Sequence, residues 1–81
     1  MTNDIDARLR KIFGQLFPVD PTALVDSDRR GELQGWDSLG HLDLVTALEN
    51  EFQISIEAER ALEIETFGEA KQVLAQLLGD A

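Results

Sequence analysis

The chain contains no cysteine, and this absence removes several classes of protein. Disulfide scaffolds, metal sites built from thiolates and enzymes with a cysteine nucleophile of their own are excluded. The sequence also has a single histidine, His41. One histidine leaves few pairings of a nucleophile with a general base, so we expect the chain not to be an enzyme.

Long apolar runs are missing as well. No stretch approaches the roughly 20 apolar residues that a membrane-spanning helix needs, so we expect no membrane association. Residues 1–6 are polar and acidic, and they lack the basic start and apolar centre of a secretory signal. The sequence therefore predicts a cytoplasmic location.

Basic residues are scarce, because 7 Lys and Arg stand against 16 Asp and Glu and give a formal net charge of −9. Such a charge repels nucleic acids and anionic lipid surfaces, and neither is an expected partner. It attracts proteins that carry basic patches, through encounters that salt weakens. We expect several transient protein partners of this kind.

What is present suffices for one small folded domain. The chain has 81 residues, of which 43% are hydrophobic, enough for a core but not for a second domain. We therefore interpret residues 1–81 as a single domain and expect a monomer.

Apolar residues recur at helical spacing along most of the chain, which predicts an all-α fold. Pro18 and Pro21 interrupt the first pattern and begin a long loop. The expected architecture is a four-helix bundle with a long first loop and a short third helix. The predicted elements are a first helix over about residues 4–16, a loop over 17–37, and helices over about 38–52, 57–63 and 67–78.

The same spacing predicts which side chains face the interior. Leu42 is expected on the buried stripe of the second helix, and Ala58, Ala61 and Leu62 on the inner side of the third. Thr66 and Glu69 fit a capping box, in which each side chain accepts from the other's backbone N–H. The first, second and fourth helices are expected to enclose an apolar interior that can accommodate an acyl chain.

The segment around Ser38 places a hydroxyl at the start of a helix, directly after the long loop. Asp37 is the expected N-cap, and Leu39 is expected to be exposed among polar neighbours. On the tripeptide alone, a helix-capping serine is the favoured interpretation of Ser38. The free N–H groups and partial positive charge of a helix start also suit a phosphate ester.

Asp37-Ser38-Leu39, followed by an amphipathic helix that ends Leu48-Glu49-Asn50-Glu51-Phe52, resembles the acyl carrier protein family, and the spacing of most of the chain agrees. The resemblance implies that a phosphopantetheinyl transferase esterifies Ser38 with 4′-phosphopantetheine from coenzyme A. Asp37 and Leu39 then flank the attachment site. The thiol of the arm holds acyl groups as thioesters and presents them to loading and processing enzymes of fatty-acid, polyketide or related biosynthesis.

By the same resemblance, the second helix carries the surface that partner enzymes recognise. Gly40 and Asn50 stand where the fatty-acid type usually has acids, which argues against recognition by fatty-acid enzymes. The Gly35-Trp36 lead-in and the Gly40-His41-Leu42 run resemble instead dedicated carriers of secondary metabolism or specialised acyl transfer. Near the motif, we expect His41 to be a partly buried structural residue and Trp36 a core anchor. The expected partner surface comprises Leu39, Asp43, Thr46, Glu49 and Glu51.

Three alternatives remain open at this point. The chain could be an aminoacyl or peptidyl carrier, or an acidic adaptor without a prosthetic group. It could also be a calcium sensor, because residues 26–31 followed by Leu33 and Asp37 resemble part of an EF-hand loop. Arg30 occupies a position that needs an oxygen ligand there, and Pro21 interrupts the entering helix, so no metal site is expected.

Overall fold

Four α-helices make up most of the computed structural model, which describes residues 2–79 and their side chains from residue 5 onward. Helix α1 spans Thr2–Leu16, α2 spans Ser38–Phe52, α3 spans Ala58–Glu63 and α4 spans Phe67–Gly79. The expected all-α bundle with a long first loop and a short third helix is confirmed. The loop contains one short 3-10 turn, η1, at Pro21–Ala23.

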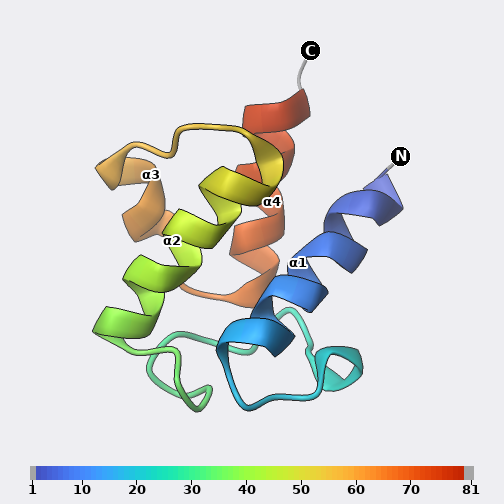
Figure 1. Cartoon of the computed structure of the whole chain (residues 1–81), viewed down its shortest axis with the longest axis vertical. Helices are drawn as coiled ribbons and strands as arrows, with labels where there is room; N and C mark the ends of the chain where they lie inside the picture. The colour runs from blue at the N-terminus through green and yellow to red at the C-terminus, as the bar shows by residue number, and fades with distance from the viewer. Residues whose placement is uncertain (1, 80–81) are drawn as a thin grey trace.

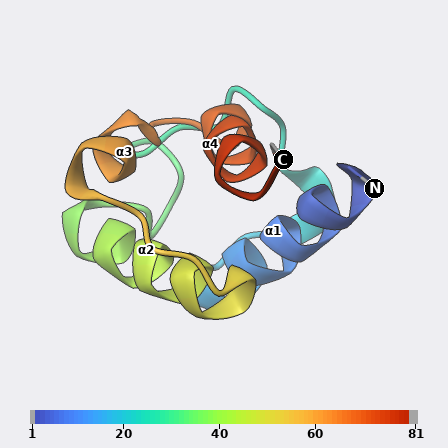
Figure 2. The same cartoon turned by 90° about the horizontal axis from the view of Figure 1, so that it is seen from above.

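The helices surround a common core, with α1 packed against α2 and α4, and α3 beside α4 (Figures 1 and 2). Phe13 of α1 lies at its centre and makes edge-to-face contacts with Trp36 and Phe67, at centroid distances of 4.9 Å and 5.2 Å. All three rings are fully buried. This aromatic cluster ties the loop, α1 and the start of α4 together.

The long loop passes beneath the helices, at the bottom of Figure 1, and is pinned to the start of α4. The first N–H groups of a helix have no partner within it, and here loop carbonyls accept from them. Phe67 N–H donates to Asp28 O at 2.9 Å, and Gly68 N–H donates to Asp26 O at 3.0 Å. The loop is therefore held in place by α4 rather than free.

Several buried and exposed positions differ from the expectation. Leu42 and Leu62 were expected in the interior, but each is 64% exposed, and Ala58 is exposed too. The capping box is also only half right. Thr66 Oγ1 accepts from Glu69 N–H, whereas the Glu69 carboxylate accepts from the N–H of Glu65 instead of Thr66.

Candidate functional site

Ser38 is the first residue of α2, and its side chain is exposed. Asp37 is the N-cap, as expected, and its carboxylate accepts from Gly40 N–H at 2.8 Å. The cap therefore occupies one N–H of the first turn, while the helix start still favours negative charge beside the Ser38 hydroxyl. Leu39, the next residue, is 74% exposed.

Behind Ser38, His41 joins three segments of the chain. The buried Trp36 Nε1–H donates to His41 Nδ1 at 3.0 Å, and His41 Nε2 lies 2.9 Å from the carbonyl oxygen of Ala61 in α3. Because an indole only donates and a carbonyl only accepts, the ring is neutral with its proton on Nε2. His41 thus holds the loop and α3 against α2, and both it and Trp36 take the expected structural roles.

Burial is the main reason that the pKa of His41 lies below its ordinary value. The nearby positive charge of Arg30 lowers the pKa further, while the hydrogen bond to Ala61 opposes both effects. The neutral ring is the form that the hydrogen bond from Trp36 requires, because a protonated Nδ1 could not accept it. The lowered pKa is consistent with this neutral ring.

A groove runs from Ser38 along the space between α2 and α3. Its first part, with a volume of about 460 Å³, is lined by Arg30, Ser38, His41, Leu42 and Leu62. Its second part, of about 430 Å³, shares His41, Leu42 and Leu62 with the first. The second part continues past Val45 to Ile56 and is mostly apolar. The exposure of Leu42 and Leu62 follows from this groove, whose walls they form.

The groove also corrects the expected position of an acyl-binding interior. Between α1, α2 and α4, fully buried side chains such as Trp36, Phe13 and Leu44 fill the space. An apolar opening lies between α2 and the short α3. A chain attached at Ser38 would meet it directly.

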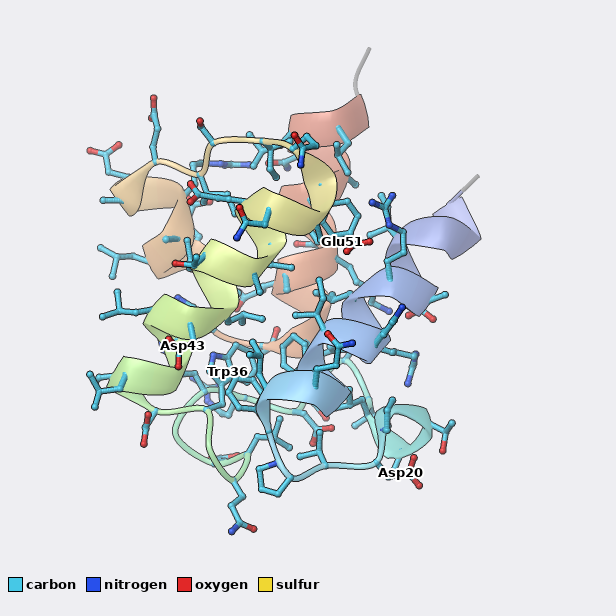
Figure 3. All side chains as sticks on the ribbon, viewed as in Figure 1. Asp20, Trp36, Asp43 and Glu51 are labelled. Carbon is cyan, nitrogen blue, oxygen red and sulfur yellow. The ribbon has the colours of Figure 1, made fainter. Side chains whose placement is uncertain are left out.

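The expected partner surface divides into two parts. Leu39, Asp43 and Thr46 are exposed on α2, and Figure 3 shows Asp43 on the outer side of the helix. Glu49 is half-buried and accepts from Ile56 N–H at 2.8 Å, which fixes the connector to α3. Glu51 turns toward α1 in Figure 3 and pairs with Arg8 at 2.9 Å. Glu49 and Glu51 thus contact the connector and α1, while Leu39, Asp43 and Thr46 lie exposed along α2.

The acidic loop that resembled an EF-hand uses its carboxylates for other contacts. Asp26 Oδ1 lies 2.7 Å from Lys71 Nζ, and Asp28 Oδ2 accepts from Val25 N–H at 2.9 Å. Among the residues that the structure describes, no three His, Asp or Glu side chains gather as metal ligands would. Every helix in the same part of the chain is too short or too polar to cross a bilayer.

Sequence reasoning missed Arg30 as a site residue. In the sequence, Arg30 stood out only as a residue without a ligand oxygen in an EF-hand-like loop. The structure places it in the wall of the groove that contains Ser38. No local pattern signals this position, because loop pairing with residues far along the chain brings it there: Arg30 N–H donates to Glu65 O at 2.8 Å.

A 4′-phosphopantetheine arm fits these residues. The exposed Ser38 hydroxyl is available for a phosphodiester bond, the first part of the groove offers polar groups, and the second offers an apolar lining. This order matches an anionic phosphate followed by a long arm and an acyl group. The residues present are thus compatible with the group that the resemblance implied.

Comparison with known proteins agrees with this geometry. Residues 7–79 match the family described as "Phosphopantetheine attachment site". The chain is 34% identical over 77 residues to an acyl carrier protein of Phenylobacterium zucineum, an alignment that covers 95% of this chain and 98% of that one. An acyl carrier protein of Phaeodactylum tricornutum is 42% identical over 60 residues, with 73% and 78% of the two chains covered. One of Caulobacter vibrioides is 34% identical over 74 residues, with 91% and 95% covered. The chain belongs to the acyl carrier protein family and contains its phosphopantetheine attachment domain.

Proposed function

We propose that Ser38 is the attachment residue and that residues 1–81 form a single carrier domain, which holds acyl groups as thioesters for successive partner enzymes. The observation that carries this proposal is the exposed Ser38 hydroxyl at the start of α2, at one end of an apolar groove. The chain's own part is to present that hydroxyl, to fix α3 against α2 through His41, and to shelter what is attached. The arm, when bound, supplies the thiol that the chain lacks.

The chain acts as a substrate of other enzymes rather than as a catalyst. Asp37, the carboxylate nearest in sequence to Ser38, is committed to Gly40 N–H, and His41 Nδ1 is committed to Trp36. His41 Nδ1 therefore has no lone pair left to accept the proton of Ser38 Oγ, and Asp37 is held in its capping position. We infer that a phosphopantetheinyl transferase provides the base and the metal ion for attachment.

The finer assignment is a dedicated carrier of acyl groups in the cytoplasm. The apolar lining of the groove favours an acyl cargo over an aminoacyl one. Gly40 has no acidic side chain because a Cβ there would overlap the carbonyl oxygen of Gly35. The exposed face of α2 offers Leu39, Asp43 and Thr46 to partner enzymes, with Asp43 available to a basic patch, in a pattern that favours enzymes other than those of general fatty-acid synthesis. We propose that the carrier works as a monomer.

Intact-mass measurement tests the attachment. Apo protein incubated with coenzyme A, Mg²⁺ and a broad-specificity phosphopantetheinyl transferase is expected to gain the mass of one phosphopantetheine group. Ser38→Ala is expected to gain nothing, while Ser55→Ala, a matched loss of an exposed hydroxyl, gains the group as wild type does. Unchanged mass of the wild-type protein would favour an adaptor without a prosthetic group.

Methyl NMR tests the groove. With an octanoyl group on the arm, the methyl resonances of Leu42 and Leu62 are expected to shift relative to the free-thiol form, because the chain would lie between them. Leu77, which is on α4, serves as the control. Equal spectra for the two forms would refute acyl shelter in this groove.

A further inference from the structure

The guanidinium of Arg30 is nearly unpaired. Within residues 5–79, its one ion pair is to Glu65 Oε2, at 4.0 Å, which is beyond hydrogen-bond distance. The other arginines all donate hydrogen bonds: Arg8 to Glu51, Arg10 to Asp6, Arg29 to Glu65 and Arg60 to Glu63. The Arg30 side chain is nevertheless only 25% exposed. Its donors are thus partly sheltered and without a close acceptor.

The backbone holds this arginine at the groove. Arg30 N–H donates to Glu65 O, and Gly31 N–H donates to Trp36 O, both at 2.8 Å. Arg29 forms an antiparallel bridge with Thr66, which further fixes the segment against the connector before α4. The backbone of Arg30 is therefore fixed at a position from which its side chain lines the Ser38 groove.

We propose that Arg30 binds the phosphodiester of the arm on Ser38 and so directs the arm into the groove between α2 and α3. This inference rests on the proposed function. The phosphate is bonded directly to Ser38 Oγ, so it stays within the part of the groove that Arg30 lines. A guanidinium presents paired donors that match two phosphate oxygens, and its charge opposes that of the phosphodiester.

The overall charge favours a role for a positively charged residue near Ser38. At a net charge of −9, the chain repels a phosphodiester on average, and the start of α2 offers only a partial positive charge. Arg30 supplies a full charge on the α3 side of Ser38, next to His41 and Leu62. A phosphate drawn to that side leaves the rest of the arm facing the apolar part of the groove.

Phosphorus NMR of the holo protein with a free thiol tests the proposal, since no cargo then influences the position of the arm. Wild type, Arg30→Gln, Arg30→Lys and the control Arg29→Gln are first checked by intact mass for complete attachment. The phosphodiester resonance is expected to move in Arg30→Gln and to stay in place in Arg29→Gln, with Arg30→Lys between them. In wild type and Arg29→Gln the phosphodiester resonance also shifts as the salt concentration rises to about 1 M, because the Debye length is then about 3 Å and the contact with Arg30 is screened. Arg30→Gln loses that salt response.

Urea unfolding gives a second readout. The ratio of the unfolding equilibrium constants of the apo and holo forms measures how much attachment stabilises the fold. This ratio is expected to be about 3 to 10 times smaller in Arg30→Gln than in wild type, the range of a partly exposed charged contact. Comparing apo and holo forms cancels the loss of the Glu65 pair. Arg30 does not hold the phosphate if all fully loaded variants have the same phosphorus chemical shift, the same salt response and the same apo-to-holo ratio of unfolding equilibrium constants. A protein that never gains the arm refutes the proposed function instead.

Discussion

Replacing His41 with leucine removes a buried link between three segments at little change in volume. Trp36 Nε1–H and the Ala61 carbonyl each lose a partner, and the indole N–H lies in a fully buried side chain. A buried polar group without a partner costs about 1 to 3 kcal/mol, so we expect a loss of about 2 to 4 kcal/mol in the free energy of unfolding. An 81-residue domain has only about 4 to 12 kcal/mol in total. The variant should therefore lose a sizeable fraction of its stability.

Urea and thermal unfolding measure this loss, with the single tryptophan as the fluorescent probe. The melting temperature is expected to fall by about 4 to 8 °C for each kcal/mol lost. Thr46→Ala, at an exposed position on the same helix, is the control and should stay within about 0.5 kcal/mol of wild type. A loss below about 1 kcal/mol for His41→Leu would show that the two hydrogen bonds do not hold α3 and the loop to α2.

The His41→Leu variant also tests how the free energy of unfolding depends on pH. The pKa of His41 in the folded protein is lowered, first by burial, below the ordinary value of 6.5. The unfolded chain therefore binds the proton more tightly, so the contribution of His41 is complete above pH 6.5 and is lost as the pH falls through the folded pKa. Between about pH 8 and about pH 5, wild type should lose stability and the gap to His41→Leu should narrow. A constant gap would contradict the neutral, doubly bonded ring.

Three further predictions concern other contacts, and equilibrium unfolding checks each. Asp37→Ala removes the cap of α2 and should cost about 1 kcal/mol, whereas no loss would show that the cap hydrogen bond is unimportant. Gly40→Ala should be destabilising by about 1 to 3 kcal/mol because its Cβ would overlap Gly35 O. Helix propensity alone predicts a gain of about 1 kcal/mol at that position, so the sign of the change decides. Asp6 has a lowered pKa, chiefly through its hydrogen bond from Arg10, so its contribution is complete above pH 3.8 and is lost at more acid pH. Asp6→Asn should remove that part of the acid sensitivity at a cost of at most about 1 kcal/mol at neutral pH, and an unchanged acid profile would contradict the assignment.

Local signals predicted the helices and the cap well. Asp37 caps α2 because the short carboxylate reaches a backbone N–H that is three residues away, which needs no tertiary contact. His41 faces inward because helical periodicity fixes its direction once α2 forms. Leu39 is exposed for the same reason. These features depend on neighbours in sequence, so the sequence alone suffices for them.

Features that depend on distant segments were predicted poorly. Leu42 lies on an apolar stripe, but whether the stripe meets a core or a groove depends on where α3 lies, and six residues of α3 give little signal. Glu49 was expected at a partner surface, yet the connector to α3 brings Ile56 N–H to it. Arg30 reaches the groove only through pairing with Glu65. Periodicity carries no information about such long-range pairings.

Localising the arm tests the central claim most directly. After loading with coenzyme A and a transferase, the protein is digested and the modified peptide is fragmented in a mass spectrometer. We predict that the phosphopantetheine group is found on Ser38 and on no other hydroxyl. A group on Ser27 or Ser55, or a fully active transferase reaction that leaves every peptide unmodified, would contradict the account.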